Sequence, residues 1–142
     1  MAQDIISHIG IAVADLEASI ARYQILTGRT VSDIEEVRDQ RVRVAMFSPA
    51  DGPGESGGRI ELVAPTSDDS PVGRFIADHG EGLHHLCLYV DDIDAKLREL
   101  KAAGVRLIDE SPRVGAGGKR IAFVHPGSIG GVLIELEERS AT

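Results

Sequence analysis

The chain has 142 residues, of which 42% are hydrophobic, and a formal net charge of −8 at pH 7. This length and composition predict one compact globular domain, or two small modules that share one core. The negative charge disfavours a nucleic-acid partner, which requires a basic surface, and no apolar run approaches the roughly 18 residues of a membrane span.

The first half predicts one strand, one helix and three further strands. The strand at 5–13 begins within a few residues of Met1, which leaves no room for a targeting peptide and predicts a cytoplasmic location. Apolar residues near helical spacing then predict a helix at 15–27 that ends at Gly28. Strands follow at 31–37, 41–47 and 59–63, with a loop rich in Gly and Pro at 48–58.

The second half repeats this order after a linker at 65–82, in which Ser70 and Pro71 open a short helix to about residue 79. The pattern predicts strands at 83–90, 105–108, 120–124 and 131–137, a helix at 92–103 capped by Gly104, and a glycine-rich loop at 115–118. Cys87, the one cysteine, lies in an alternating apolar run and is expected to be a small core residue. Each half therefore reads βαβββ.

We predict an α+β fold, with a single domain over 1–142 made of two βαβββ modules at about 5–65 and 82–138. Their curled mixed sheets, related by a pseudo-two-fold axis, would enclose a metal cleft. The modules are each about 70 residues, which is marginal for independent folding, so we expect them to fold against one another.

A duplicated motif carries the candidate chemistry. His8 recurs as His85 at an offset of 77 residues, and Glu61 recurs as Glu135 at an offset of 74, each Glu standing between Ile and Leu. Because side chains alternate along a strand, both carboxylates should face the side opposite their apolar neighbours. Four such N and O donors suit Co²⁺, Mn²⁺, Ni²⁺, Fe²⁺ or Zn²⁺, and ligand type alone does not choose among these ions.

Three other histidines are weaker candidates. His84 adjoins His85, and alternation predicts that it points to the opposite face. His79, on the linker helix, is expected to be solvated, and His125 is expected in a turn, where it either touches a ligand or caps the turn. Neither His79 nor His125 has a counterpart in the other half.

Motifs along nearly the whole chain resemble the vicinal oxygen chelate superfamily and, within it, the methylmalonyl-CoA epimerases. The residues that carry this resemblance are at 8–13, 80–88, 115–126 and 131–136. The resemblance implies the paired βαβββ fold, a homodimer, and one divalent metal per chain, commonly Co²⁺ in assays. It also implies the ligands His8, Glu61, His85 and Glu135, and interconversion of (2R)- and (2S)-methylmalonyl-CoA.

Three positions depart from that family pattern. Glu61 stands where many bacterial members have Gln, which adds a negative charge and a possible base. Val44 occupies a third-strand position where some members carry a proposed catalytic Glu. Gly127 replaces a Lys that follows His-Pro in the family, which removes one contact to the phosphates of CoA.

The chemistry of epimerisation suggests roles for the two carboxylates. Inversion at C2 through a metal-stabilised enolate requires that a proton leave one face and that another be delivered to the opposite face. Residues related by a pseudo-two-fold axis approach a central substrate from opposite sides. We therefore expect Glu135 and Glu61 to be the catalytic bases, with Glu135 the stronger candidate because the family assigns a base there.

The glycine-rich loop at 115–118, with the two residues after it, is the candidate substrate-binding segment. Its backbone amides and nearby cations could hold an anionic acyl-CoA substrate, although the alternatives of a plain connecting turn and of solvated surface cations stay open. The residues concerned are Gly115, Ala116, Gly117, Gly118, Lys119 and Arg120, with Arg113 nearby.

Other functions share parts of this pattern. A glyoxalase I-like lactoylglutathione lyase uses a similar His/Glu set, but its last turn differs from the His125-to-Gly131 segment here. An extradiol oxygenase uses two His and one carboxylate on Fe²⁺, which leaves Glu61 unexplained. A non-catalytic small-molecule-binding protein would favour aromatic-lined clefts, and this chain has no Trp. Sequence does not separate methylmalonyl- from ethylmalonyl-CoA.

Overall fold

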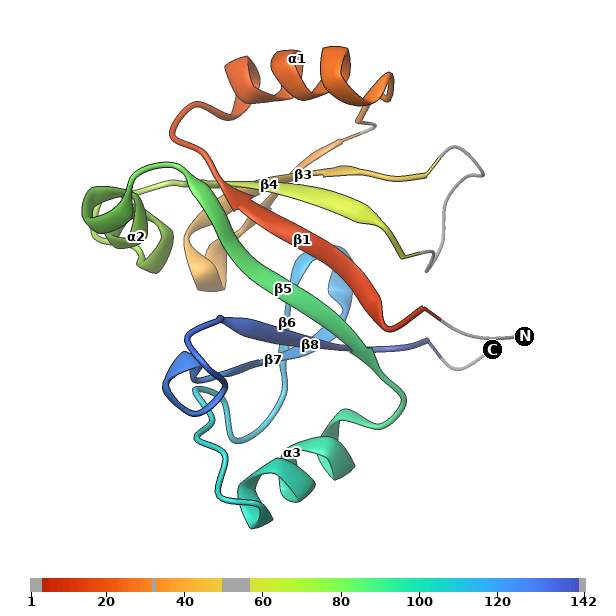
Figure 1. Ribbon diagram of the computed structural model, residues 1–142. Helices are drawn as coiled ribbons and strands as arrows, with labels where there is room; N and C mark the ends of the chain where they lie inside the picture. The colour runs from red at the N-terminus through yellow and green to blue at the C-terminus, as the bar shows by residue number, and fades with distance from the viewer. Residues whose placement is uncertain (1–3, 32, 50–56, 141–142) are drawn as a thin grey trace.

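The computed structural model describes residues 4–31, 33–49 and 57–140. Its centre is a curled eight-stranded sheet in the order β2-β3-β4-β1-β5-β8-β7-β6 (Figure 1). The strands are β1 (Ile6–Ala12), β2 (Ile34–Val37), β3 (Val42–Phe47), β4 (Arg59–Pro65), β5 (Gly82–Val90), β6 (Arg113–Val114), β7 (Arg120–Val124) and β8 (Ile134–Glu138). The helices are α1 (Leu16–Thr27), α2 (Pro71–His79) and α3 (Ile93–Ala102), with short 3₁₀ turns at Arg38–Gln40, Ala116–Gly118 and Pro126–Ser128.

The two halves of the sheet mirror one another in strand order. β1 and β5 pair antiparallel at the centre, and each has a parallel neighbour on its other side, β4 beside β1 and β8 beside β5. The outer strands of both halves pair antiparallel. The predicted α+β fold with paired βαβββ arrangements and a curled mixed sheet is confirmed.

Equivalent helices cover the convex face of each half, α1 over the first and α3 over the second (Figure 1). Asp15 and Asp92 cap them at positions 77 residues apart, and each side chain accepts a hydrogen bond of 3.0 Å from the amide three residues on. Leu16 packs against Leu62 in the first core cluster, and Ile93 packs against Leu136 in the second. Gly28 ends α1 in the left-handed region, as predicted.

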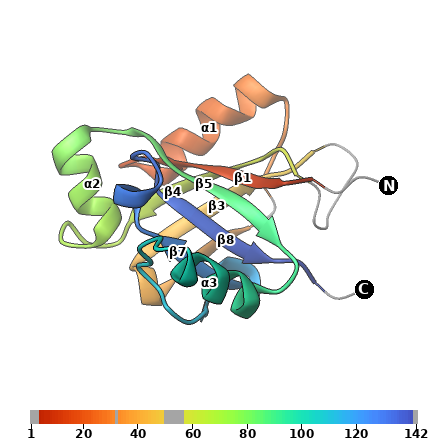
Figure 2. The ribbon, with the colours of Figure 1, turned by 60° about the horizontal axis from the view of Figure 1, so that its bottom comes forward.

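α2 belongs to neither repeat and lies at one end of the central strands (Figures 1 and 2). Its Val72 packs against Val44 and Val63, which face the concave side of the sheet. The linker helix therefore covers one end of the concave face with apolar side chains.

Several predicted boundaries are wrong. No strand forms at 105–108, where Leu107 makes one isolated bridge to Val124. The amides of Ile108 and Asp109 both donate to the carbonyl of Phe123, so a regular ladder cannot continue. The strand that follows α3 is instead β6, at Arg113–Val114. β2 and β8 begin at Ile34 and Ile134, later than predicted. Most of the predicted 48–58 loop lies outside the described residues. Within the described ranges, no helix has the length and apolarity needed to span a membrane.

Candidate metal centre

The four predicted ligands come from the four central strands, His8 on β1, Glu61 on β4, His85 on β5 and Glu135 on β8. They all face the concave side, where their exposed fractions are only 3%, 6%, 7% and 7%. Ile60 and Leu62, the neighbours of Glu61, pack against the α1 side as alternation predicted. Strands far apart in sequence thus bring the duplicated motif to one point.

Four donor atoms converge there. Nε2 of His8 lies 3.5 Å from Oε1 of Glu61 and 3.3 Å from Oε1 of Glu135. Nε2 of His85 lies 3.4 and 3.1 Å from the same two oxygens, and the two Nε2 atoms are 3.3 Å apart. Donor atoms at about 2.0 Å from a tetrahedral Zn²⁺ lie about 3.3 Å apart, which is the range of these five distances. The donor set therefore fits one divalent first-row cation.

The residues before the two histidines do not obey simple alternation. The β1–β5 register shifts between Ile6 and His8, and again between Gly10 and Ile11, opposite residues 83–85. These β-bulges turn Ser7 and His84 toward the same side as the histidines that follow them. Ser7 Oγ lies 3.0 Å from Nδ1 of His8, and His84 Nδ1 lies 2.9 Å from Nδ1 of His85.

The prediction that His84 faces away from the site is therefore wrong. Burial, and then the proximity of His85, lowers the pKa of His84 to about 4, so this imidazole is neutral at pH 7. A neutral His84 can accept a hydrogen bond from Nδ1–H of His85, so Nε2 is the nitrogen of His85 that is left to bind a cation. His125 instead accepts from the amide of Gly127 within its turn, and His79 is exposed and stacks on Phe75.

In the absence of a cation, the imidazoles balance the carboxylates. Burial lowers the pKa of His85, but hydrogen bonds to Glu135 and Glu61 outweigh it and raise that pKa to about 9. Burial also lowers the pKa of His8, but hydrogen bonds to Cys87, Glu135 and Glu61 outweigh it and raise that pKa. Burial raises the pKa of both Glu61 and Glu135, yet hydrogen bonds from the two histidines hold each below its ordinary value. A bound cation would replace these protons as the balancing charge.

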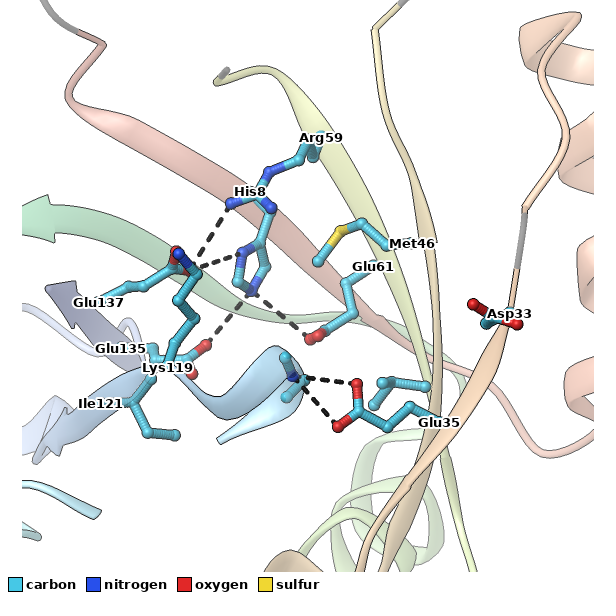
Figure 3. A pocket seen from close by; sticks show the side chains of 13 residues that line it. His8, Asp33, Glu35, Met46, Arg59, Glu61, Lys119, Ile121, Glu135 and Glu137 are labelled. Atoms are coloured by element: carbon cyan, nitrogen blue, oxygen red, sulfur yellow. Dashed lines mark hydrogen bonds and ion pairs between the residues drawn. The ribbon is translucent and has the colours of Figure 1, made fainter. Parts of the chain in front are cut away.

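A cavity of about 270 Å³ opens beside His8 and reaches from the metal centre to the loop at 115–118 (Figure 3). Of the predicted substrate-binding residues, Ala116, Gly117 and Lys119 line it. Gly115 and Gly118 lie in the same loop but not in the lining, and the guanidinium of Arg120 contacts Asp94 and Glu138 instead.

The cavity also contains charged residues that the sequence did not single out. The amide of Gly117 donates to both carboxylate oxygens of Glu35, at 3.0 and 3.1 Å (Figure 3). Arg59 and Glu137 lie two residues from Glu61 and Glu135 on the same strands, so period-two alternation could have found both. Val44, the third-strand position singled out in the sequence, is a lining residue too.

A smaller cavity of about 30 Å³ lies on the His85 side of the centre. Its lining includes Glu61 and Glu135, which it shares with the larger cavity, and His84. Its other walls are mainly apolar side chains, those of Val37, Val44, Val63, Val72 and Phe123.

Comparisons with known proteins agree with this arrangement. The family model of the Glyoxalase/Bleomycin resistance protein/Dioxygenase superfamily matches residues 7–123. The mitochondrial methylmalonyl-CoA epimerase of Dictyostelium discoideum is 37% identical over 94% of this chain and 78% of its own length. The ethylmalonyl-CoA/methylmalonyl-CoA epimerase of Cereibacter sphaeroides is 36% identical over 94% of this chain and 96% of its own length. A solved methylmalonyl-CoA epimerase in complex with methylmalonyl-CoA and NH₄⁺ superposes with a TM-score of 0.89, at 38% identity over 99% of this chain and 97% of the other.

Proposed function

We propose that this chain, which belongs to the glyoxalase/bleomycin resistance protein/dioxygenase superfamily and within it to the methylmalonyl-CoA epimerases, interconverts (2R)- and (2S)-methylmalonyl-CoA. It is an isomerase by that membership. The observation that carries the proposal is the pairing of Glu61 and Glu135, two buried carboxylates from equivalent strands that meet the same two imidazoles.

The donor set supports one divalent cation per chain, held by His8, Glu61, His85 and Glu135. Co²⁺ is the ion we expect to support activity in vitro, with Mn²⁺, Ni²⁺, Zn²⁺ and Fe²⁺ as alternatives. When bound, the cation supplies positive charge that offsets the negative charge developing on the substrate oxygens as the C2 proton leaves.

Glu61 and Glu135 remove and return the C2 proton. Inversion at C2 requires one base to remove a proton from one face and another acid to return a proton to the opposite face. β4 and β8 flank the central β1–β5 pair on opposite sides, so their carboxylates approach the concave centre from two directions. A positioned carboxylate contributes roughly 10²–10⁴-fold to such a transfer.

The cavities supply the remaining recognition. The side chains of Arg59 and Lys119 line the larger cavity and bring positive charge to a protein whose net charge is −8. The small apolar cavity would hold the C2 substituent. One extra methylene is worth only about 1–3 kcal/mol in such a pocket, so ethylmalonyl-CoA is the second substrate to test.

The test is exchange of the C2 proton of (2S)-methylmalonyl-CoA in D₂O, followed by NMR or mass spectrometry, on metal-replete and chelator-treated protein. We expect exchange and formation of the (2R) epimer, lost with chelator and restored by Co²⁺. The control substrate is the hemithioacetal of methylglyoxal and glutathione. Turnover of the hemithioacetal without metal-dependent exchange of the thioester would overturn the proposal in favour of a lactoylglutathione lyase.

A further inference from the structure

A buried polar cluster lies behind His8, at the ring nitrogen that faces away from the other donors. We call it the Ser7 cluster, and it consists of Ser7, Arg59, Cys87, Tyr89 and Glu137. The hydroxyl of Ser7 lies 3.0 Å from both Nδ1 of His8 and Oε1 of Glu137. Arg59 donates to Ser7 Oγ and to the Tyr89 hydroxyl, and its Nη2 lies 3.6 Å from Oε1 of Glu137 (Figure 3).

The direction of these hydrogen bonds is set by proton count. A carboxylate paired with Arg59 accepts, so Ser7 donates its one proton to Glu137. Arg59 can only donate, so Ser7 accepts from it. Ser7 then has no proton left for His8, and Nδ1 of His8 must be the donor to Ser7 Oγ. Once a cation displaces the proton on Nε2, the hydrogen bonds from Glu137 through Ser7 to Nδ1 leave His8 in the tautomer in which Nε2 carries the lone pair.

The other half of the molecule has no equivalent series of hydrogen bonds behind His85. At the equivalent offsets, His84 replaces Ser7 and Val63 replaces Glu137, while Leu133 replaces Arg59. His85 is therefore oriented by a neutral imidazole, whereas His8 is connected to a buried carboxylate that is only 4% exposed. The four donors are arranged symmetrically, but their surroundings are not.

We propose that Glu137 is a positioning residue for the metal centre, acting through Ser7. It holds the His8 ring in the orientation and tautomer that present Nε2 to a cation, and its negative charge makes that nitrogen a better donor. Carboxylates behind a ligating histidine change metal affinity by about 10–100-fold when removed. The inference rests on the divalent cation of the proposed function, but its test does not use epimerase activity.

A purely structural role is the alternative. Glu137 and Arg59 form a buried ion pair, and removing one partner of such a pair destabilises a protein whatever happens at the metal. The two roles differ in Ser7→Ala, which keeps both partners of the Glu137–Arg59 ion pair and removes the hydroxyl that joins them to His8.

The experiment compares Glu137→Gln, Ser7→Ala, the double variant and Glu138→Gln. Glu138 is the matched control because it is the next residue on β8, faces the other way, and binds Arg120 and the amide of Ile93. Co²⁺ and Zn²⁺ affinity is measured at fixed pH by competition with a chelator. The visible absorption of the Co²⁺ protein reports the ligand field, and thermal unfolding of the metal-free protein reports stability.

We expect Glu137→Gln and Ser7→Ala each to weaken affinity about 10–100-fold and to shift the Co²⁺ absorption. The double variant should be no more than about threefold weaker than the weaker-binding single variant, because both act through one chain. Glu138→Gln should keep affinity within about threefold. Unchanged affinity and absorption in Ser7→Ala would overturn the inference, and this holds even if Glu137→Gln fails to fold. Wild-type protein that binds no Co²⁺ would instead overturn the metal centre itself.

Discussion

A methyl group at position 10 would collide with the ring of His85. An ideal Cβ built on Gly10 lies 2.0 Å from Cε1, 2.3 Å from Nδ1 and 2.5 Å from Nε2 of that ring. Carbon atoms in ordinary contact are about 3.5–4.0 Å apart. Gly10 lies opposite His85 in the β1–β5 register and does not have a positive φ, so its backbone accepts alanine. The imidazole must therefore move by about 1.5 Å.

Such a shift is large compared with the tolerance of a metal site. Ligand distances must be met within about 0.2 Å, and Nε2 of His85 now lies 3.1–3.4 Å from the other three donor atoms. We expect Gly10→Ala to weaken Zn²⁺ or Co²⁺ binding by at least about 100-fold, at the upper end of what loss of ligand orientation costs. Overpacking should also destabilise the metal-free protein by about 1–3 kcal/mol.

Chelator competition measures the first effect, and chemical denaturation of the metal-free protein measures the second. The control is Gly10→Ala in a His85→Ala background, where the ring is gone and the added methyl should cost less than about 0.5 kcal/mol. Equal destabilisation in both backgrounds, or wild-type metal affinity in Gly10→Ala, would refute this account of the packing.

Three further predictions follow from the charges at the centre. Metal affinity should rise with pH up to about 9 with release of protons, measured by titration calorimetry in buffers of different ionisation enthalpy, because the pKa of His85 is raised to about 9 in the metal-free protein. The stabilisation that this raised pKa gives the metal-free protein is fully present below pH 6.5 and is lost as pH rises through 9. Denaturation in chelator should therefore show the free energy of unfolding falling by about 3 kcal/mol over that range. Glu61→Gln should keep a bound cation but lower kcat by about 10²-fold or more, and unchanged turnover would remove Glu61 as a base.

The repeated pattern predicted which four side chains meet because two features of the sequence are enough to place them. Alternation along a strand sets the face of each side chain, and the repeated motif fixes which residues are equivalent. His8, Glu61, His85 and Glu135 therefore needed no long-range information beyond the assumption that the two halves pair.

His84 shows where local reasoning fails. The β-bulges beside His8 and His85 depend on how β1 and β5 pair with each other, and a strand read by itself carries no sign of that register shift. The absent 105–108 strand has a similar cause. Its residues are strand-like, but the Asp109 side chain takes the amide of Phe123, a contact between segments 14 residues apart.

Duplication explains the donors better than it explains the chemistry. A centre with two equivalent halves would treat the two faces of a substrate alike, yet the epimers of a thioester are different molecules bound in one chiral cleft. Here the asymmetry begins one contact behind the ligands, with Ser7 and Glu137 on one side and His84 and Val63 on the other. The His8 side is polar and opens to the larger cavity, whereas the His85 side borders the small, mainly apolar one. In the proposed epimerase reaction, the surroundings of the four donors would therefore orient the substrate in one sense and give Glu61 and Glu135 different partners in the proton transfer.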